Sequence, residues 1–319
     1  MKQSLCPYTL KPLAEISNTN GEHILPRAFG APESFTVPAD EAENTRMNDQ
    51  IDSPAINDPL MRLLAVTQGV KSRSGSVRAK LKGVVTESGE EVIAILGQEG
   101  IDFRFVAPVD VDENGSVKGV RGFGDAAQKL VNQFLRDSAR KGRKMEVDET
   151  VSQPNPHLSL GLEGDLKVIH KEVRKIAYLM TVRIFGDEAI KSRSGEIYRA
   201  AIHAETEEEV QATGLRGGTN IDSIATLARA KHNEHALTCF RIGSAIVSAV
   251  ILFGSITGIC ITPAEGFSAP ELAGEVIIIN ATTGTLTSAP YDQWIRDFMQ
   301  TPEFGQAMVR AASLQTYKT

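Results

Sequence analysis

The apolar residues of this chain recur with a helical period in several stretches. Apolar side chains occupy the i, i+3, i+4, i+7 and i+8 positions of residues 127–135, which is the pattern of an amphipathic helix. The same period runs over residues 169–180, and Asp165 stands where an N-cap is needed. A closing segment around Trp294 is also amphipathic. These patterns predict three long helices, and residues 221–230 favour a further short one.

Short runs rich in β-branched residues, bounded by turn formers, predict strands elsewhere. Residues 80–96 match a hairpin around the turn at 87–90, and the runs 103–106 and 117–120 flank a second turn. The C-terminal half adds strand candidates at 236–242, 245–253, 256–262 and 275–280. Strands that follow one another over short connections pair antiparallel, so the sequence predicts an α+β fold with a mostly antiparallel sheet.

The longest apolar stretch, residues 245–261, is broken by Ser and Gly and is rich in β-branched residues. This favours buried strands over a membrane span. The first seven residues lack the apolar core of a signal peptide, and the three scattered cysteines do not make a disulfide framework. We therefore expect a cytoplasmic protein with no membrane partner.

Charge is distributed unevenly along the chain. The whole sequence holds 34 Lys and Arg against 40 Asp and Glu, a net charge of -6, which by itself argues against a protein that wraps a polyanion. However, residues 1–58 carry four bases against nine acids, residues 59–86 carry six bases and no acid, and residues 118–144 carry eight bases against two acids. We predict an N-terminal module (1–58), a basic segment that contacts nucleic acid (59–148) and an α+β C-terminal domain with a dimerisation or sensing role (149–319).

The most informative residues form the run Gly21-Glu22-His23-Ile24-Leu25-Pro26-Arg27-Ala28-Phe29-Gly30, followed by Glu43-Asn44 and Ile51-Asp52. Glu22 and His23 are neighbours, so on a strand they point to opposite faces. A Glu oxygen supported by an Asn amide oxygen suits Mg²⁺ or Mn²⁺ better than Zn²⁺. A neutral imidazole can take a proton from water near neutral pH. Together these groups indicate hydrolysis of a phosphodiester by an activated water, with a cation neutralising the phosphate.

This stretch, about residues 5–55, resembles the HNH endonuclease family, the ββα-metal nucleases, in the branch that carries a Glu-His-Ile-x-Pro motif. The resemblance implies a small N-terminal ββα-metal module in which His23 is the general base. It also implies that Glu22 and Asn44 hold one divalent cation, Mg²⁺ or Mn²⁺. Asn48 is the alternative ligand to Asn44, and Arg27 stands where the start of a helix can meet a phosphate.

The sequence departs from that family at its zinc ribbon. Cys6 stands at the first zinc cysteine, but its partner position is Thr9, and the second Cys-x-x-Cys aligns with residues 40–43, which contain no cysteine. One thiolate cannot close a tetrahedral zinc site, so we do not expect a structural zinc. We expect packing on the rest of the chain to brace the module instead.

These observations predict a metal-dependent endonuclease that hydrolyses nucleic acid, DNA being favoured, and the resemblance suggests a role in restriction or phage defence. Cleavage of both strands by a one-metal module needs two protomers or two successive events, and the first alternative predicts a homodimer. The residues expected to contact the nucleic-acid backbone are Arg27, Arg62, Lys71, Arg73, Arg78, Arg140 and Lys141. The alternative is a catalytically decayed relative that only binds nucleic acid or a protein partner.

Other motifs are less informative. The pentapeptide Lys-Ser-Arg-Ser-Gly occurs at 71–75 and at 191–195, and it suits a phosphate-contacting loop or, slightly favoured, an ordinary turn. Residues 214–218 are Gly-rich but lack the Lys-Ser/Thr of a P-loop. His232 and His235 are spaced i, i+3 at an expected helix end and could ligate a metal, but no Cys or carboxylate completes a site at a recognised spacing. We expect them at the surface or at the end of a helix.

Overall fold

The computed structural model describes residues 3–72, 75–111, 113, 117–142, 156–219, 230–302 and 304–305. By its internal contacts the chain forms two compact units: unit 1 joins Met1–Gly75 to Asp165–Thr319, and unit 2 is Ser76–Gly164. Both combine helices with antiparallel sheets, so the predicted α+β class is confirmed. The division differs from the predicted boundaries at 58 and 148. Those boundaries followed composition and charge, whereas the units are set by which segments pack together.

The N-terminal part of unit 1 is a hairpin followed by a helix. β1 (Thr19–His23) pairs antiparallel with β2 (Thr36–Asp40), and α1 (Glu41–Met47) follows directly. The Asp40 side chain accepts a hydrogen bond from the Ala42 amide and caps α1. The order strand, strand, helix is the one that the HNH resemblance implies. Shorter elements complete this part: η1 (Leu13–Glu15), η2 (Arg27–Phe29), the π-helical η3 (Asn48–Asp52), α2 (Ser53–Asn57), α3 (Pro59–Thr67) and β3 (Lys71–Ser72). The two-residue strand β4 (Gly75–Ser76) contains the last residue of this part and the first residue of unit 2.

The C-terminal part of unit 1 is built on a six-stranded antiparallel sheet in the order β11-β14-β13-β12-β15-β16. Its strands are β11 (Arg216–Thr219), β12 (Glu234–Ile242), β13 (Ala245–Leu252), β14 (Ile256–Pro263), β15 (Gly274–Asn280) and β16 (Leu286–Pro290). The four strands predicted in this half are confirmed. β11 and β16 were not predicted, because they are short and lack an apolar run.

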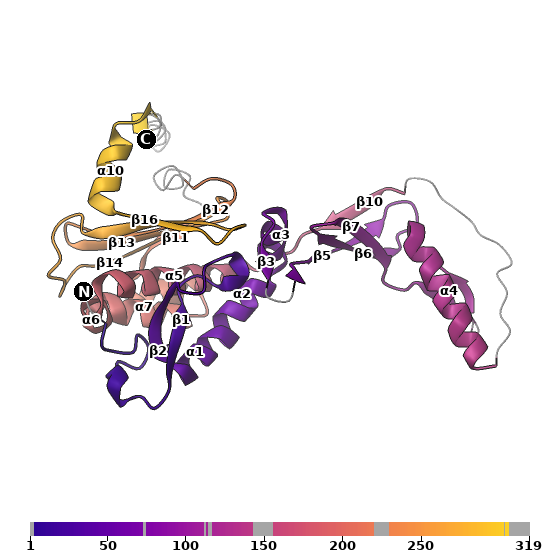
Figure 1. Cartoon of the computed structure of the whole chain (residues 1–319), viewed down its shortest axis with the longest axis horizontal. Coiled ribbons are helices and arrows are strands. Elements are labelled where there is room, and N and C mark those ends of the chain that lie inside the picture. The colour runs from indigo at the N-terminus through magenta and orange to yellow at the C-terminus, as the bar shows by residue number, and fades with distance from the viewer. Residues whose placement is uncertain are drawn as a thin grey trace. The chain divides into compact units, whose positions relative to one another are not determined.

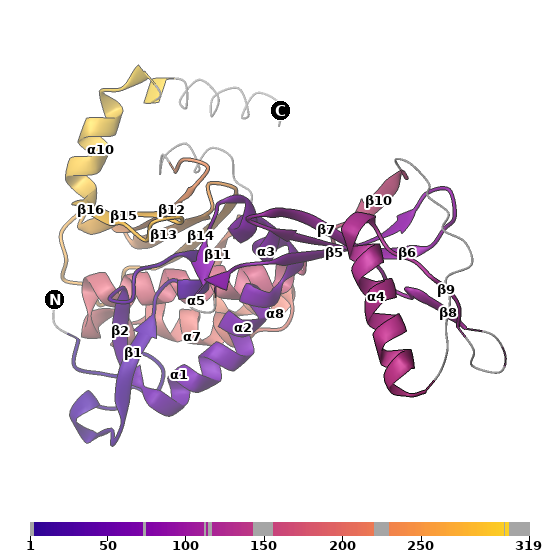
Figure 2. The same cartoon turned by 45° about the vertical axis from the view of Figure 1, so that its right-hand side comes forward.

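Helix α5 (Leu166–Phe185) is the centre of unit 1. It lies against one face of the six-stranded sheet beside α7 (Arg193–His203), and the N-terminal hairpin lies on the other side of these helices (Figure 1). α10 (Tyr291–Met299) lies on the opposite side of the sheet, as Figure 2 also shows. Because α5 is covered on both sides, thirteen of its residues are buried. No helix in the described part of the chain is long and apolar enough to cross a bilayer.

Two short helices flank α7, and the first of them shows the structure of the second Lys-Ser-Arg-Ser-Gly pentapeptide. α6 (Asp187–Lys191) stops at Ser192, whose side chain caps α7, so the second copy of the pentapeptide ends one helix and begins the next. It is therefore not an open loop. α8 (Glu207–Thr213) ends at Gly214 in the left-handed conformation. The expected helix at 221–230 falls almost entirely outside the described residues.

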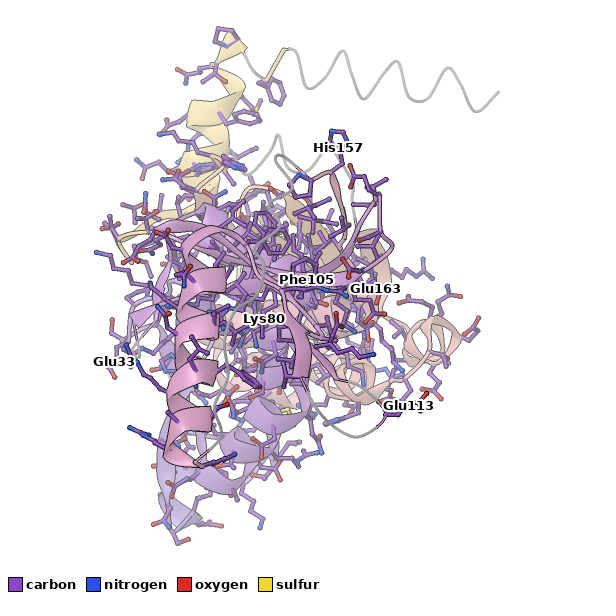
Figure 3. The ribbon with its side chains drawn as sticks, turned by 90° about the vertical axis from the view of Figure 1, so that its right-hand side faces the viewer. Glu33, Lys80, Phe105, Glu113, His157 and Glu163 are labelled. Atoms are coloured by element: carbon purple, nitrogen blue, oxygen red, sulfur yellow. The ribbon has the colours of Figure 1, made fainter. Side chains whose placement is uncertain are left out.

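In the part that the structure describes, unit 2 contains a four-stranded antiparallel sheet, a two-stranded ribbon and one helix. The sheet runs in the order β10-β5-β6-β7, and the helix α4 (Gly124–Arg140) is the predicted amphipathic one. The predicted hairpin at 80–96 is confirmed, with Val84 opposite Glu91. Figure 3 labels Lys80 on β5 and Phe105 at the end of β7. The strands are β5 (Ala79–Val85), β6 (Glu91–Gly97), β7 (Gly100–Phe105), β8 (Val109–Val111), β9 (Val117–Val120) and β10 (Leu158–Gly161).

Candidate functional site

The end of β1 separates Glu22 from His23. Glu22 is completely buried, whereas His23 is half-buried, as expected for neighbours on a strand. The chain then turns through η2 and ends the turn at Gly30 with φ 94°. A Cβ at Gly30 would lie 2.1 Å from the Ala281 carbonyl oxygen, so glycine is required there by both conformation and space.

The Glu22 carboxylate is bound by a lysine from α5. Lys175 Nζ lies 2.6 Å from Glu22 Oε1 and 2.5 Å from Asp52 Oδ1, and the Lys175 side chain has no exposed surface. Tyr8 donates its hydroxyl to the same Glu22 oxygen at 3.1 Å. The Lys175 ammonium thus joins β1 and η3 to α5 inside the core of unit 1.

A third carboxyl, Glu172, lies one turn before Lys175 on α5 and is also completely buried. Burial first, and then the Asp52 carboxylate, raise the pKa of Glu172 well above its usual value, so this side chain keeps its proton. Burial alone would lower the pKa of Lys175, but the Asp52 and Glu22 carboxylates outweigh it and raise that pKa. We call Glu22, Asp52, Glu172 and Lys175 the Lys175 cluster.

His23 follows Glu22 on β1, and its side chain therefore points to the opposite face of the strand. Burial first, and then the positive charges of Arg27 and Lys175, lower the pKa of His23, which favours the neutral imidazole. Its Nδ1 atom is buried and has no hydrogen-bond partner in the described part of the chain. Arg27 forms an ion pair with Glu33 at 2.6 Å, and both side chains retain exposed surface.

The two predicted asparagine ligands lie on and after α1. Asn44 donates its side-chain N–H to Asn20 Oδ1 at 2.6 Å and to the Gly21 carbonyl at 3.3 Å, so it fastens α1 to β1. Asn48 is exposed and donates to Asp49 Oδ1. Asn44 therefore lies beside the strand that carries Glu22, whereas Asn48 points to a neighbouring acid.

A divalent cation does not fit at Glu22 in this arrangement. The carboxylate is completely buried, one of its oxygens already binds an ammonium and a phenol, and Asp52 shares the same ammonium. A metal would have to displace Lys175, the charge that balances the carboxylates. Within the described ranges, no three His, Cys, Asp or Glu side chains are grouped so as to hold a metal.

The turn that contains Cys6 and Pro7 is held in place by the C-terminal helices of unit 1. Cys6 is buried, and its sulfur accepts a hydrogen bond from the Asp40 amide, at the position that aligns with the second cysteine pair. The following turn is fixed by the Tyr178 hydroxyl of α5, which donates to the Pro7 carbonyl, and Arg199 of α7 donates to the Tyr178 oxygen. Packing on the rest of the chain therefore holds this turn, as predicted.

The residues predicted to contact nucleic acid fall in both units. Arg62 on α3 donates to Asn57 and is half-buried, and Lys71 is exposed. These two lie in unit 1 with Arg27, whereas Arg78, Arg140 and Lys141 are exposed residues of unit 2. Arg73 lies outside the described residues. The structure therefore does not bring these cations together in one unit.

His235 was predicted to lie at the surface or at the end of a helix, and this prediction is wrong. It lies in β12, is completely buried, and its Nε2 is 2.8 Å from the Phe29 carbonyl, while Nδ1 accepts the Phe253 amide at 3.2 Å. The prediction was wrong because the preceding polar residues suggested a helix end, whereas the chain enters a central strand. This histidine links η2, directly after the His23 motif, to the sheet.

Sequence reasoning also missed Lys175 and Glu172. A signal for Glu172 exists, because it stands three residues after Ile169 on the apolar stripe of the helix and is therefore expected to be buried. Lys175 gives no such signal, since its partners lie over 120 residues away in the chain.

Comparison of the chain with protein-family models, with curated proteins and with solved structures found no match.

Proposed function

We propose that this protein is a nuclease that hydrolyses phosphodiester bonds, with His23 as the general base. The observation that supports this most directly is the half-buried His23 at the end of the hairpin, whose pKa is lowered by burial and by the positive charges of Arg27 and Lys175. A neutral imidazole beside a guanidinium suits a phosphate substrate, because the cation attracts the phosphate while the base accepts a proton.

The step uses only groups of this chain and water. His23 accepts a proton from a water molecule as that water attacks the phosphorus, and the bond between phosphorus and the leaving oxygen breaks. The leaving oxygen takes its proton from solvent. Arg27 balances the charge on the phosphate after it leaves Glu33, an exposed partner whose loss costs little. The Lys175 cluster has a positioning role, since it fixes the strand that ends in His23.

The test is nicking of supercoiled plasmid DNA by the full chain with Mg²⁺, with Mn²⁺ and with EDTA. We expect His23→Ala to cut at least about 100-fold more slowly than wild type, the range found for loss of a general base. His157→Ala is the matched control, because His157 is an exposed histidine of unit 2, and it should cut at the wild-type rate. Equal rates for His23→Ala and wild type would refute the proposal.

A second candidate is a nucleic-acid-binding protein without catalysis. It is favoured by the fact that Lys175 binds the carboxylate expected to hold a metal. In that case the wild-type chain shifts DNA in a gel, with an affinity that falls steeply with salt, and leaves the plasmid intact under all three conditions.

A further inference from the structure

A cavity lies on the other side of α5 from the Lys175 cluster. It has a volume of about 120 Å³ and is bounded by α5, α8, β11 and β14. The ionisable side chains of His, Arg and Glu that line it are His170, Arg174, Glu207 and Arg216. All of these residues belong to unit 1, and none of them takes part in the site around His23.

Arg174 is buried in the wall of this cavity but is poorly paired. Its residue is 6% exposed, and its Nε atom is buried without a hydrogen-bond partner among the described residues. It forms an ion pair with Glu207 at 3.9 Å, a long contact to a carboxylate that is 66% exposed. A guanidinium has five N–H donors, and buried donors of this kind are nearly always satisfied in proteins.

The balance of charge in the cavity is positive. Glu207 is the acid among its lining residues, and it also lies 3.6 Å from His170 Nδ1. Against it stand Arg174 and the exposed Arg216, while Cys260 in the wall is neutral because burial raises the pKa of its thiol to about 12. The nearby Glu205 is paired with Lys167 and Lys171, so it does not supply the missing anion.

The size of the cavity limits what can enter. Sites for drug-sized ligands occupy roughly 300–1,000 Å³, whereas this space suits a few heavy atoms and their water. A guanidinium binds planar and tetrahedral oxyanions with two parallel N–H groups.

We propose that this cavity binds a small free oxyanion, inorganic phosphate or a short carboxylate, through Arg174, with Arg216 at the entrance. The ligand completes the hydrogen bonding of a buried guanidinium. This role is independent of cleavage at His23.

The test is isothermal titration calorimetry of the full chain with sodium phosphate and with sodium acetate at matched ionic strength. We expect saturable binding of at least one of these anions, weakened about tenfold or more in Arg174→Met, in line with the loss of charge-assisted hydrogen bonds. Arg183→Met is the control, because Arg183 is also on α5 but pairs with Glu275, and it should bind like wild type. Arg216→Ala should weaken binding without a change in folding, since Arg216 is exposed.

The proposal is wrong if wild type shows no saturable binding of either anion up to about 10 mM. A Kd at that limit corresponds to a binding free energy of roughly -3 kcal/mol. Equal affinities of wild type, Arg174→Met and Arg216→Ala would also overturn the proposal. A double-stranded oligonucleotide is the third ligand. If binding of the oligonucleotide depends on Arg174 while neither free anion binds, the cavity contacts nucleic acid, and the small-anion proposal is wrong.

Discussion

Two buried polar side chains, Lys175 and His235, connect the first 75 residues to the C-terminal part of unit 1. They differ in their charge state. Lys175 stays charged because carboxylates surround it. His235 stays neutral: Nδ1 accepts the Phe253 amide, so the proton is on Nε2, which donates to the Phe29 carbonyl. Burial lowers the pKa of His235 to about 4. Each therefore contributes to stability in a different range of pH.

The pKa of His235 predicts how the stability of unit 1 depends on pH. The unfolded chain binds a proton at this site near pH 6.5, whereas the folded chain does so near pH 4. Between these values the unfolded state binds more protons, so stability falls as the pH drops through this window and the loss is complete below it. The loss is on the order of 3 kcal/mol.

Urea unfolding at a series of pH values measures this effect. We expect His235→Gln, whose amide can accept and donate in the same way, to be less stable at pH 7 but to show a flatter decline between pH 6.5 and 4. The exposed His157→Gln should keep the wild-type decline. An unchanged decline in His235→Gln would show that other groups set the acid sensitivity.

At the level of single residues, the sequence predicts the motif but not its surroundings. The alternation of a strand was enough to place Glu22 and His23 on different faces, and an Asp before an apolar stripe was enough to place the cap at Asp165. The partners of Glu22 could not be predicted, because Lys175 is brought to it by packing of distant segments. For the same reason, the motif alone did not reveal that an ammonium occupies the expected metal position.

Among the elements, α5 connects the two parts of unit 1. One of its faces carries Glu172 and Lys175 toward β1 and η3. Another carries Arg174 toward the cavity that α5 shares with α8, β11 and β14. A third packs on the sheet, where a Cβ at Gly258 of β14 would lie 2.4 Å from Val173 Cγ1. The spacing of apolar residues predicted this helix and its cap, but a helix buried on all sides shows too little contrast for its partners to be inferred.

Removal of the buried ammonium should destabilise unit 1 strongly. Lys175→Met leaves Glu22 and Asp52 without their shared cation, and breaking a buried ion pair costs about 3–5 kcal/mol. Lys171→Met is the matched control on the same helix, because Lys171 pairs with the exposed Glu205. This substitution should lower the free energy of unfolding by about 1 kcal/mol or less.

Urea unfolding of both variants at pH 7 measures the difference. The double variant Lys175→Met with Glu22→Gln should lose less than the two single losses combined, because the carboxylate no longer needs the ammonium. Similar losses for Lys175→Met and Lys171→Met would mean that the Lys175 cluster does not hold the hairpin to α5.

At the scale of the whole molecule, the chain leaves unit 1 after residue 75 and returns to it at residue 165. Strands β5 and β10 pair antiparallel, with Lys82 opposite Gly161, so the chain enters and leaves unit 2 at adjacent strands. Unit 2 contains twelve basic and fourteen acidic residues, a net charge of -2, so the basic segments seen in the sequence do not make this unit basic. Charge along the chain therefore predicted the position of boundaries poorly, since oppositely charged segments fold into the same unit.

Unit 1 should fold without unit 2. Its hairpin, Lys175 cluster and six-stranded sheet are contacts among its own residues, and a flexible linker of about eight Gly and Ser residues spans roughly 16 Å, enough to join adjacent strand ends. We expect residues 1–75 joined in this way to 165–319 to unfold cooperatively, with a free energy of unfolding within about 1 kcal/mol of that of unit 1 in the full chain.

The same shortened chain separates catalysis from substrate binding. His23 and Arg27 remain, so nicking at saturating DNA should keep its rate. Loss of Arg78, Arg140 and Lys141 should weaken DNA binding and reduce its salt dependence by about one unit of slope for each lost phosphate contact.

Unfolding is followed by circular dichroism, and binding by fluorescence anisotropy at several salt concentrations. An unchanged salt slope would assign the nucleic-acid surface to unit 1, whose sequence keeps the predicted contacts Arg27, Arg62, Lys71 and Arg73. A shortened chain that fails to unfold cooperatively would instead show that unit 2 is part of the structural support of the His23 site.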